Sequence, residues 1–125
     1  MRKVNVSNGE LIDKYTILSI KIDRIKDKEK LVNVEAEHEM LNPILRELLT
    51  IDPMVLKYYI ALQEVNNQLW QIEDDLRMLE TESRFDREFI ELARLVYKTN
   101  DQRAAIKNKI NKITKSGLTE EKSYK

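Results

Sequence analysis

Glycine and proline, the residues that most often form tight turns, are almost absent from this protein: each occurs only twice in 125 residues. An all-β fold needs turn residues about every 8–12 positions, and this sequence cannot supply them. Leu, Ile, Glu and Lys are the commonest residues instead, and a composition of this kind favours helix. The sequence therefore predicts an all-α antiparallel bundle with few connections.

The first helical segment is predicted over residues 7–50, after an N-terminal arm at 1–6. Ser7 followed by Glu10 is a capping box. Apolar residues recur every three or four positions as far as Ile25, and the pattern resumes at Leu31 in another phase. A phase slip requires a kink or a loop. We expect three long helices, or four if this segment breaks at 26–30 or at 42–43.

Two further helices are predicted over residues 53–82 and 86–115. Asp52 before Pro53 is a strong start signal. The most regular apolar seam of the sequence follows: Val55, Tyr58, Leu62, Val65, Leu69, Ile72, Leu76 and Leu79. A short turn with Ser83 or Asp86 as the next cap predicts a coiled-coil-like antiparallel hairpin. Gly117 is the expected C-terminal cap, and 118–125 is a polar tail.

Composition excludes several classes of protein. The sequence has no cysteine, and its 22 basic residues equal its 22 acidic residues. Disulfide scaffolds and cysteine-ligated zinc are therefore excluded, and wholesale nucleic-acid binding is disfavoured. No apolar run approaches the ~18 residues of a membrane span, and the N-terminus lacks the apolar core of a signal peptide. We expect a single cytoplasmic domain without membrane attachment.

Catalytic and cofactor motifs are missing as well. Gly9 and Gly117 are too few for a phosphate-binding loop. His38, the single histidine, lies on an apolar stripe and is expected to pack there with one hydrogen bond. Two pairs of acids share a helix face, Glu10 with Asp13 and Glu88 with Glu91, but such pairs arise by chance in a protein this rich in acids. We expect no cofactor and no metal.

A ligand site, if the protein has one, is expected in the hairpin. Arg103 and Thr99 are polar residues at seam positions, where they fix helix register or hold an anionic group. Asn100 and Asp101 lie beside them. On the facing helix, a stripe beside the leucine seam contains Asn66, Trp70, Glu73 and Arg77. The candidate ligand-binding residues are Trp70, Glu73, Thr99, Asn100, Asp101 and Arg103.

Apolar residues outside the principal seams point to association with another protein molecule. These are Ile12, Ile17, Ile20, Tyr59, Trp70 and Leu95. They predict a homodimer, a larger assembly or a complex with another protein. The expected interface residues are Leu62, Leu69, Trp70 and Leu76.

Charge is unevenly distributed along the hairpin. Residues 64–91 have a net charge of −6, and residues 98–115 have a net charge of +5. A basic end of the last helix complements the helix dipole, and this is the interpretation we favour. RNA binding by that end is an alternative.

Four blocks of the sequence resemble an uncharacterised family, a domain of unknown function seen in bacteria and marine phages. The blocks are VNVSNGELIDKYTILSIKIDRI, NQLWQIEDDLR, FDREFIELARLVYKTNDQRAAIKNKIN and EEKSY. The resemblance extends from Val4 to Tyr124. Some bacterial members carry the domain beside glycosyltransferase-type or tetratricopeptide-repeat segments. The resemblance implies a small cytoplasmic domain of phage or bacterial source and implies no catalytic residues.

The sequence as a whole favours a non-enzymatic helical interaction or adaptor protein that associates with itself. Binding of a small anionic ligand near Trp70, Thr99 and Arg103, with or without catalysis, is the first alternative. RNA binding by the basic end of the last helix is the second.

Overall fold

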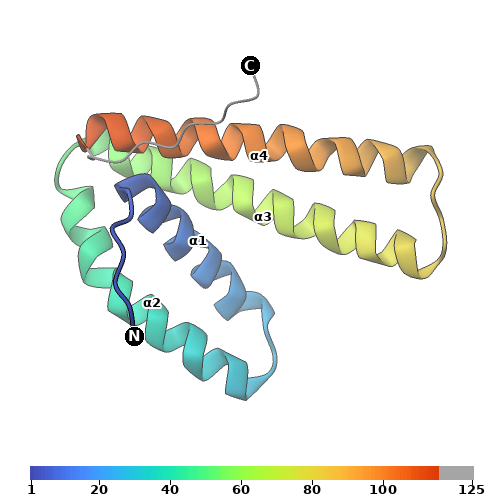
Figure 1. Cartoon of the computed structure of the whole chain (residues 1–125), viewed down its shortest axis with the longest axis horizontal. Coiled ribbons are helices and arrows are strands. Elements are labelled where there is room, and N and C mark those ends of the chain that lie inside the picture. The colour runs from blue at the N-terminus through green and yellow to red at the C-terminus, as the bar shows by residue number, and fades with distance from the viewer. Residues whose placement is uncertain (116–125) are drawn as a thin grey trace.

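The computed structural model describes residues 1–115, in which four α-helices and no strand form (Figure 1). The helices are α1 (Asn8–Arg24), α2 (Lys28–Leu49), α3 (Pro53–Thr81) and α4 (Arg87–Ile113). The all-α prediction is confirmed. The favoured count of three helices is wrong, because the first segment is divided into α1 and α2.

The division between α1 and α2 falls where the apolar pattern changes phase. Ile25 has extended backbone angles, φ −80° and ψ 131°. Asp27 then caps α2 by accepting hydrogen bonds from the backbone N–H groups of Glu29 at 3.0 Å and Lys30 at 3.5 Å. The alternative break is not used, since Pro43 lies inside α2.

The remaining helices begin at the predicted caps. Ser7 accepts a hydrogen bond from the N–H of Glu10, and Asp52 accepts one from the N–H of Met54 immediately before α3. Asp86 caps α4, whereas Ser83 lies in the turn with a φ of 54°. The predicted ends at 82 and 115 are each one or two residues too long. Gly117 and the tail at 118–125 lie outside the described residues.

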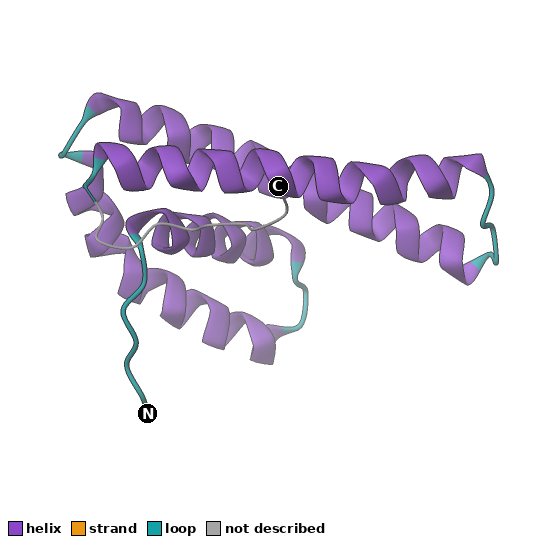
Figure 2. Cartoon of the chain, turned by 45° about the horizontal axis from the view of Figure 1, so that its top comes forward, coloured by secondary structure: helices purple, strands orange, loops and turns teal. Residues whose placement is uncertain are grey.

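The helices pack around α1. α3 and α4 form the predicted antiparallel hairpin, α1 lies against both of them, and α2 packs mainly on α1 (Figures 1 and 2). The core is formed where all four helices meet. Its buried members are Ile12, Tyr15, Leu45, Leu48, Val55, Leu62 and Ile110.

Because α1 is enclosed by three helices, it offers little apolar surface to a partner. Ile12 and Ile20 were expected to remain available for association, but they are 0% and 2% exposed. Both are buried inside the protein. Ile12 lies in the core together with Leu45 and Leu48 of α2, which folds back on α1.

The hairpin extends beyond this packed region. α1 ends level with Trp70, whose ring centroid lies 5.9 Å from the guanidinium carbon of Arg24. Beyond that level, α3 and α4 pack only on each other among the described residues, and they project past α1 and α2 (Figures 1 and 2). We call residues 71–98 the arm and the remainder of residues 1–115 the base. No helix within residues 1–115 is long and apolar enough to cross a membrane.

Candidate functional site

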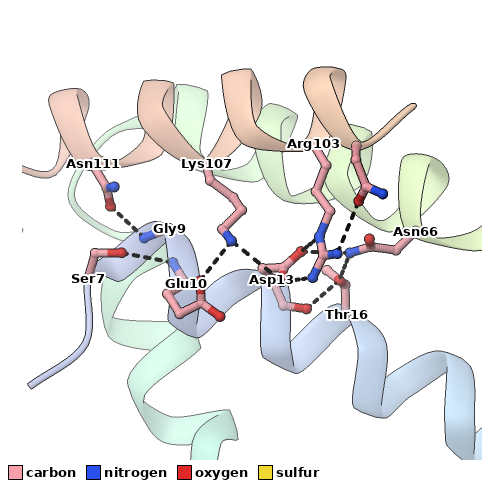
Figure 3. A network of polar contacts seen from close by, with 10 residues as sticks. Ser7, Gly9, Glu10, Asp13, Thr16, Asn66, Arg103, Lys107 and Asn111 are labelled. Atoms are coloured by element: carbon pink, nitrogen blue, oxygen red, sulfur yellow. Dashed lines mark hydrogen bonds and ion pairs between the residues drawn. The ribbon is translucent and has the colours of Figure 1, made fainter. Parts of the chain in front are cut away.

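The most concentrated group of polar side chains in the base surrounds Asp13 of α1 (Figure 3). The Asp13 side chain is 1% exposed. Arg103 of α4 binds both of its oxygens: Nε donates to Oδ1 at 2.8 Å and Nη2 donates to Oδ2 at 2.5 Å. This bidentate pair is the strongest form of arginine–carboxylate contact. It connects two helices that are far apart in the sequence.

The third helix is joined to the same carboxylate through Asn66 of α3. The Asn66 amide donates to Asp13 Oδ1 at 2.9 Å and to Thr16 Oγ1 at 2.8 Å. The Thr16 hydroxyl in turn donates to the backbone carbonyl of Asp13 at 2.7 Å. Asn66 and Thr16 are buried, so these bonds satisfy polar groups that are removed from water.

Lys107 adds a second cation one helical turn after Arg103. Its Nζ lies 2.7 Å from Glu10 Oε2 and 3.9 Å from Asp13 Oδ2. Two cations therefore face two carboxylates, and the group is electrically balanced. A buried charge without a partner is strongly unfavourable, whereas a paired and hydrogen-bonded charge is tolerated.

At the start of α1, the backbones of α1 and α4 approach each other closely. The Gly9 N–H donates to Asn111 Oδ1 at 2.7 Å, and Asn8 donates to Thr114 at 3.0 Å. A Cβ atom at Gly9 would overlap the backbone carbonyl of Lys107. Gly9, Asp13, Thr16 and Ile20 form one stripe of α1, and this stripe faces α4 and α3.

We call Glu10, Asp13, Thr16, Asn66, Arg103 and Lys107 the Asp13 network. Its ion pairs and hydrogen bonds hold α1, α3 and α4 together. Its acids are held by Arg103 and Lys107. The pair Glu10 and Asp13, considered from sequence as metal ligands, is therefore committed to cations. Among residues 1–115 no group of three or more His, Asp or Glu side chains is placed to hold a metal ion.

The residues predicted to bind a ligand are only partly brought together. Arg103 does hold an anionic group, but that group is Asp13 of the same molecule. Asn100 contacts Arg103 Nη1 through Oδ1 at 3.4 Å, and Thr99 is buried nearby in the hairpin. Trp70 lies instead against Arg24. Glu73 and Asp101 are exposed on different helices.

The predicted interface residues also divide. Leu62 and Leu69 are buried inside the protein and belong to its own core. Trp70 and Leu76 are half-buried and still present surface. The apolar seam of α3 is thus buried inside the protein in the base, and it is only partly covered in the arm.

Asp13, Lys107, Thr16 and Glu10 were not predicted as members of a joint site. The signal available in the sequence was the Gly9–Asp13–Thr16–Ile20 stripe, where small and polar residues recur at helical spacing beside an apolar stripe. Such a stripe indicates a close helix contact with buried polar groups. It does not identify the helix that makes the contact.

His38 behaves as its place on an apolar stripe predicts. It stacks on Tyr15 with the ring centroids 4.2 Å apart, and its Nε2 lies 3.0 Å from the hydroxyl oxygen of Ser19. Asn42 donates to the Tyr15 hydroxyl at 2.7 Å. These contacts fix α2 on α1 and account for the histidine without a ligand.

The basic end of α4 is smaller than its sequence suggests. Two of the six bases in residues 98–115, Arg103 and Lys107, point inward to Asp13 and Glu10. Lys98, Lys109 and Lys112 remain exposed. The internal pairs reduce the charge available for RNA phosphates.

Comparison with known proteins adds one finding. A family model described as a family of unknown function (DUF6165) matches residues 2–125. No curated protein and no solved structure matches the sequence.

Proposed function

The protein belongs to this family of unknown function, and we propose that it is a non-enzymatic interaction protein that binds a second copy of itself through the arm. One observation carries the proposal. A single stripe of α4 is buried against α1 in the base and continues, apolar and exposed, into the arm.

The stripe follows from helical spacing. Positions 90, 93, 97, 100, 104, 107 and 111 alternate in steps of three and four, so they share one face of α4. In the base, Lys107 and Asn111 contact α1 and are buried. In the arm, Ile90 and Tyr97 on the same face are 55% and 54% exposed. The arm thus presents the face that α1 covers elsewhere.

Two helices alone bury their apolar seam incompletely. Leu76 of α3 and Leu92 and Val96 of α4 are only half-buried. A second arm would supply the missing helices and complete a four-helix bundle, the arrangement in which amphipathic hairpins bury their seams.

Charge favours a second copy over an unrelated helix. Glu73 and Glu80 continue the stripe of Asn66 along α3 in seven-residue steps, and Arg94 and Lys98 lie on α4. None of these four has an ion-pair partner within residues 1–115. A two-fold interface brings each surface patch against its own copy, so the acids of one α3 can meet the bases of the other α4 twice.

The first test is the mass in solution by light scattering over a tenfold concentration range. We expect a mass of twice 14.9 kDa. Tyr97→Glu places a charge in the exposed stripe and should weaken the dimer at least about tenfold, or ~1.4 kcal/mol. Met40→Glu is the control, because Met40 is also an exposed apolar residue, at 70%, but lies on α2, away from the arm.

A charge exchange tests the partner directly. Arg94→Glu with Lys98→Glu gives one variant, and Glu73→Lys with Glu80→Lys gives another. Each alone should be largely monomeric, and a mixture of the two should form a heterodimer. A wild-type monomer at about 100 µM, or equal dimerisation by every variant, would contradict self-association through the arm.

A further inference from the structure

A cleft lies between the end of α1 and the middle of α3. None of the residues that line it belongs to the Asp13 network, and Gln71 alone belongs to the arm. Its volume is about 740 Å³, and it is open along its length. Arg24 lines it from α1, and residues between Tyr59 and Gln71 line it from α3. Twelve helical steps correspond to about 18 Å. The cleft is therefore long and open, whereas a site for a compact small molecule encloses most of its ligand.

Side-chain amides dominate the α3 wall. Gln63, Asn67 and Gln71 follow one another at four-residue steps, with Gln68 beside them. Each amide carries both donors and an acceptor. Within residues 1–115 these four amides make one hydrogen bond, which Gln71 donates to Asp75 at 2.9 Å. The wall is thus a row of groups able to pair with amides.

The spacing of this row matches an extended peptide. Four residues of helix advance about 6 Å, and two residues of an extended strand advance about 6.6 Å. Over the three amides the difference accumulates to roughly 1 Å, which flexible glutamine side chains can accommodate. Alternate backbone N–H and C=O groups of a strand can therefore meet Gln63, Asn67 and Gln71 in turn.

Arg24 provides a cation at one end of the row. Its guanidinium lies over the Trp70 ring, and within the described residues it makes no hydrogen bond or ion pair. A cation–π contact leaves the guanidinium charged, and its N–H donors can pair with a carboxylate. Glu64 lines the middle of the cleft and repels a second carboxylate there.

The opposite end is apolar. Ile60 is 58% exposed in the cleft wall. Tyr59 lies next to it. The pKa of the Tyr59 hydroxyl is raised above its ordinary value, mainly by burial and to a smaller extent by the nearby Tyr15. The Tyr59 hydroxyl is therefore neutral around pH 7, and this end suits an apolar side chain.

We propose that this cleft binds an extended peptide segment of about six residues. Its carboxylate pairs with Arg24, its backbone runs along Gln71, Asn67 and Gln63, and an apolar side chain lies on Ile60. The carboxylate belongs either to the C-terminus of a peptide or to an acidic side chain.

The probe is acetyl-Leu-Ser-Gly-Ser-Gly-Ser with a free C-terminus, titrated into the full-length protein. Fluorescence of Trp70, the single tryptophan, reports on the Arg24 contact. Nuclear magnetic resonance of the side-chain amides reports on the row. We expect saturation at about 0.1–1 mM peptide, with shifts at Gln63, Asn67 and Gln71. An amidated peptide and an amidated peptide ending in Asp separate the two sources of carboxylate.

Arg24→Ala should weaken binding at least about tenfold, whereas Arg77→Ala, an exposed arginine of the arm, should leave it unchanged. Asn67→Ala should weaken binding of the peptide but not of acetate. Circular dichroism confirms that each variant is folded. Absence of amide shifts at about 5 mM peptide, above the top of the expected range, overturns the proposal. Acetate binding as tightly as the peptide also overturns it, because the amide row then contributes nothing.

Discussion

Arg103 supplies two of the hydrogen bonds to the buried carboxylate of Asp13, and its removal should be among the most damaging single changes. Arg103→Ala leaves that carboxylate without its guanidinium partner inside the protein. Breaking a buried pair in this way costs about 3–5 kcal/mol. Urea unfolding followed by circular dichroism should show a free energy of unfolding that is lower by that amount.

Two controls separate this effect from a general loss of charge. Arg77→Ala breaks the exposed pair with Asp74, at 3.1 Å, and should change stability by less than about 1 kcal/mol. Asp13→Leu combined with Arg103→Met removes both buried charges and should cost less than Arg103→Ala alone. If the double variant loses as much free energy of unfolding as Asp13→Leu and Arg103→Met lose in sum when made singly, the two side chains are not coupled as the geometry indicates.

The sign of the stability change in Gly9→Ala tests how closely α1 and α4 approach each other. Replacing a helical glycine by alanine ordinarily stabilises by about 0.5–1 kcal/mol. At Gly9 the added carbon would lie 2.9 Å from Asn111 Oδ1 and still closer to the Lys107 carbonyl. Gly9→Ala should therefore destabilise by about 1–3 kcal/mol, the usual cost of overpacking. A rise in the urea midpoint would mean that α1 and α4 are not held at this distance.

At the residue scale the sequence reveals that a side chain is unusual more readily than it reveals its partner. Arg103 is recognisable as a polar residue at a seam position, but the anion that it binds is Asp13 of the same molecule and not a ligand. Its partner lies 90 residues away. That pairing depends on how α1 crosses α4, and the spacing of residues within one helix carries no such information.

Element boundaries are far more predictable, because they depend on local chemistry. Asp27, Asp52 and Asp86 each accept hydrogen bonds from the first backbone N–H groups of a helix. The phase change between Ile25 and Leu31 marks the break between α1 and α2. Pro43 is the exception, since local chemistry disfavours a proline inside a helix and α2 nevertheless continues through it.

That exception leads to a prediction for α2. Proline in a helix interior is about 3 kcal/mol less favourable than alanine, and it recovers about 0.4–1 kcal/mol by restricting the unfolded state. Pro43 is exposed, so alanine there should meet no steric conflict. Pro43→Ala should stabilise the protein by roughly 2 kcal/mol in urea unfolding. Destabilisation would show instead that α2 needs a bend at Pro43 to follow α1.

At the scale of the whole molecule, stability should be divided between base and arm. The base joins four helices through the core and the Asp13 network, whereas the arm has one seam and several exposed ion pairs such as Arg87 with Glu91 at 3.1 Å. Exposed pairs contribute little. The sequence predicted the hairpin but not this division, because the length of α1 relative to α3 decides it.

Hydrogen exchange can test this division and the proposed dimer together. Segments with few buried contacts open at low free energy, so amides of residues 71–98 should exchange faster than those of the base in dilute solution. Association protects whatever it covers in proportion to concentration. Raising the concentration above the dimer constant should therefore slow exchange in the arm and leave the base unchanged, as measured by mass spectrometry of peptic fragments. An arm that exchanges rapidly at every concentration has no second copy on it, and an arm as protected as the base in dilute solution is not a separate unit of stability.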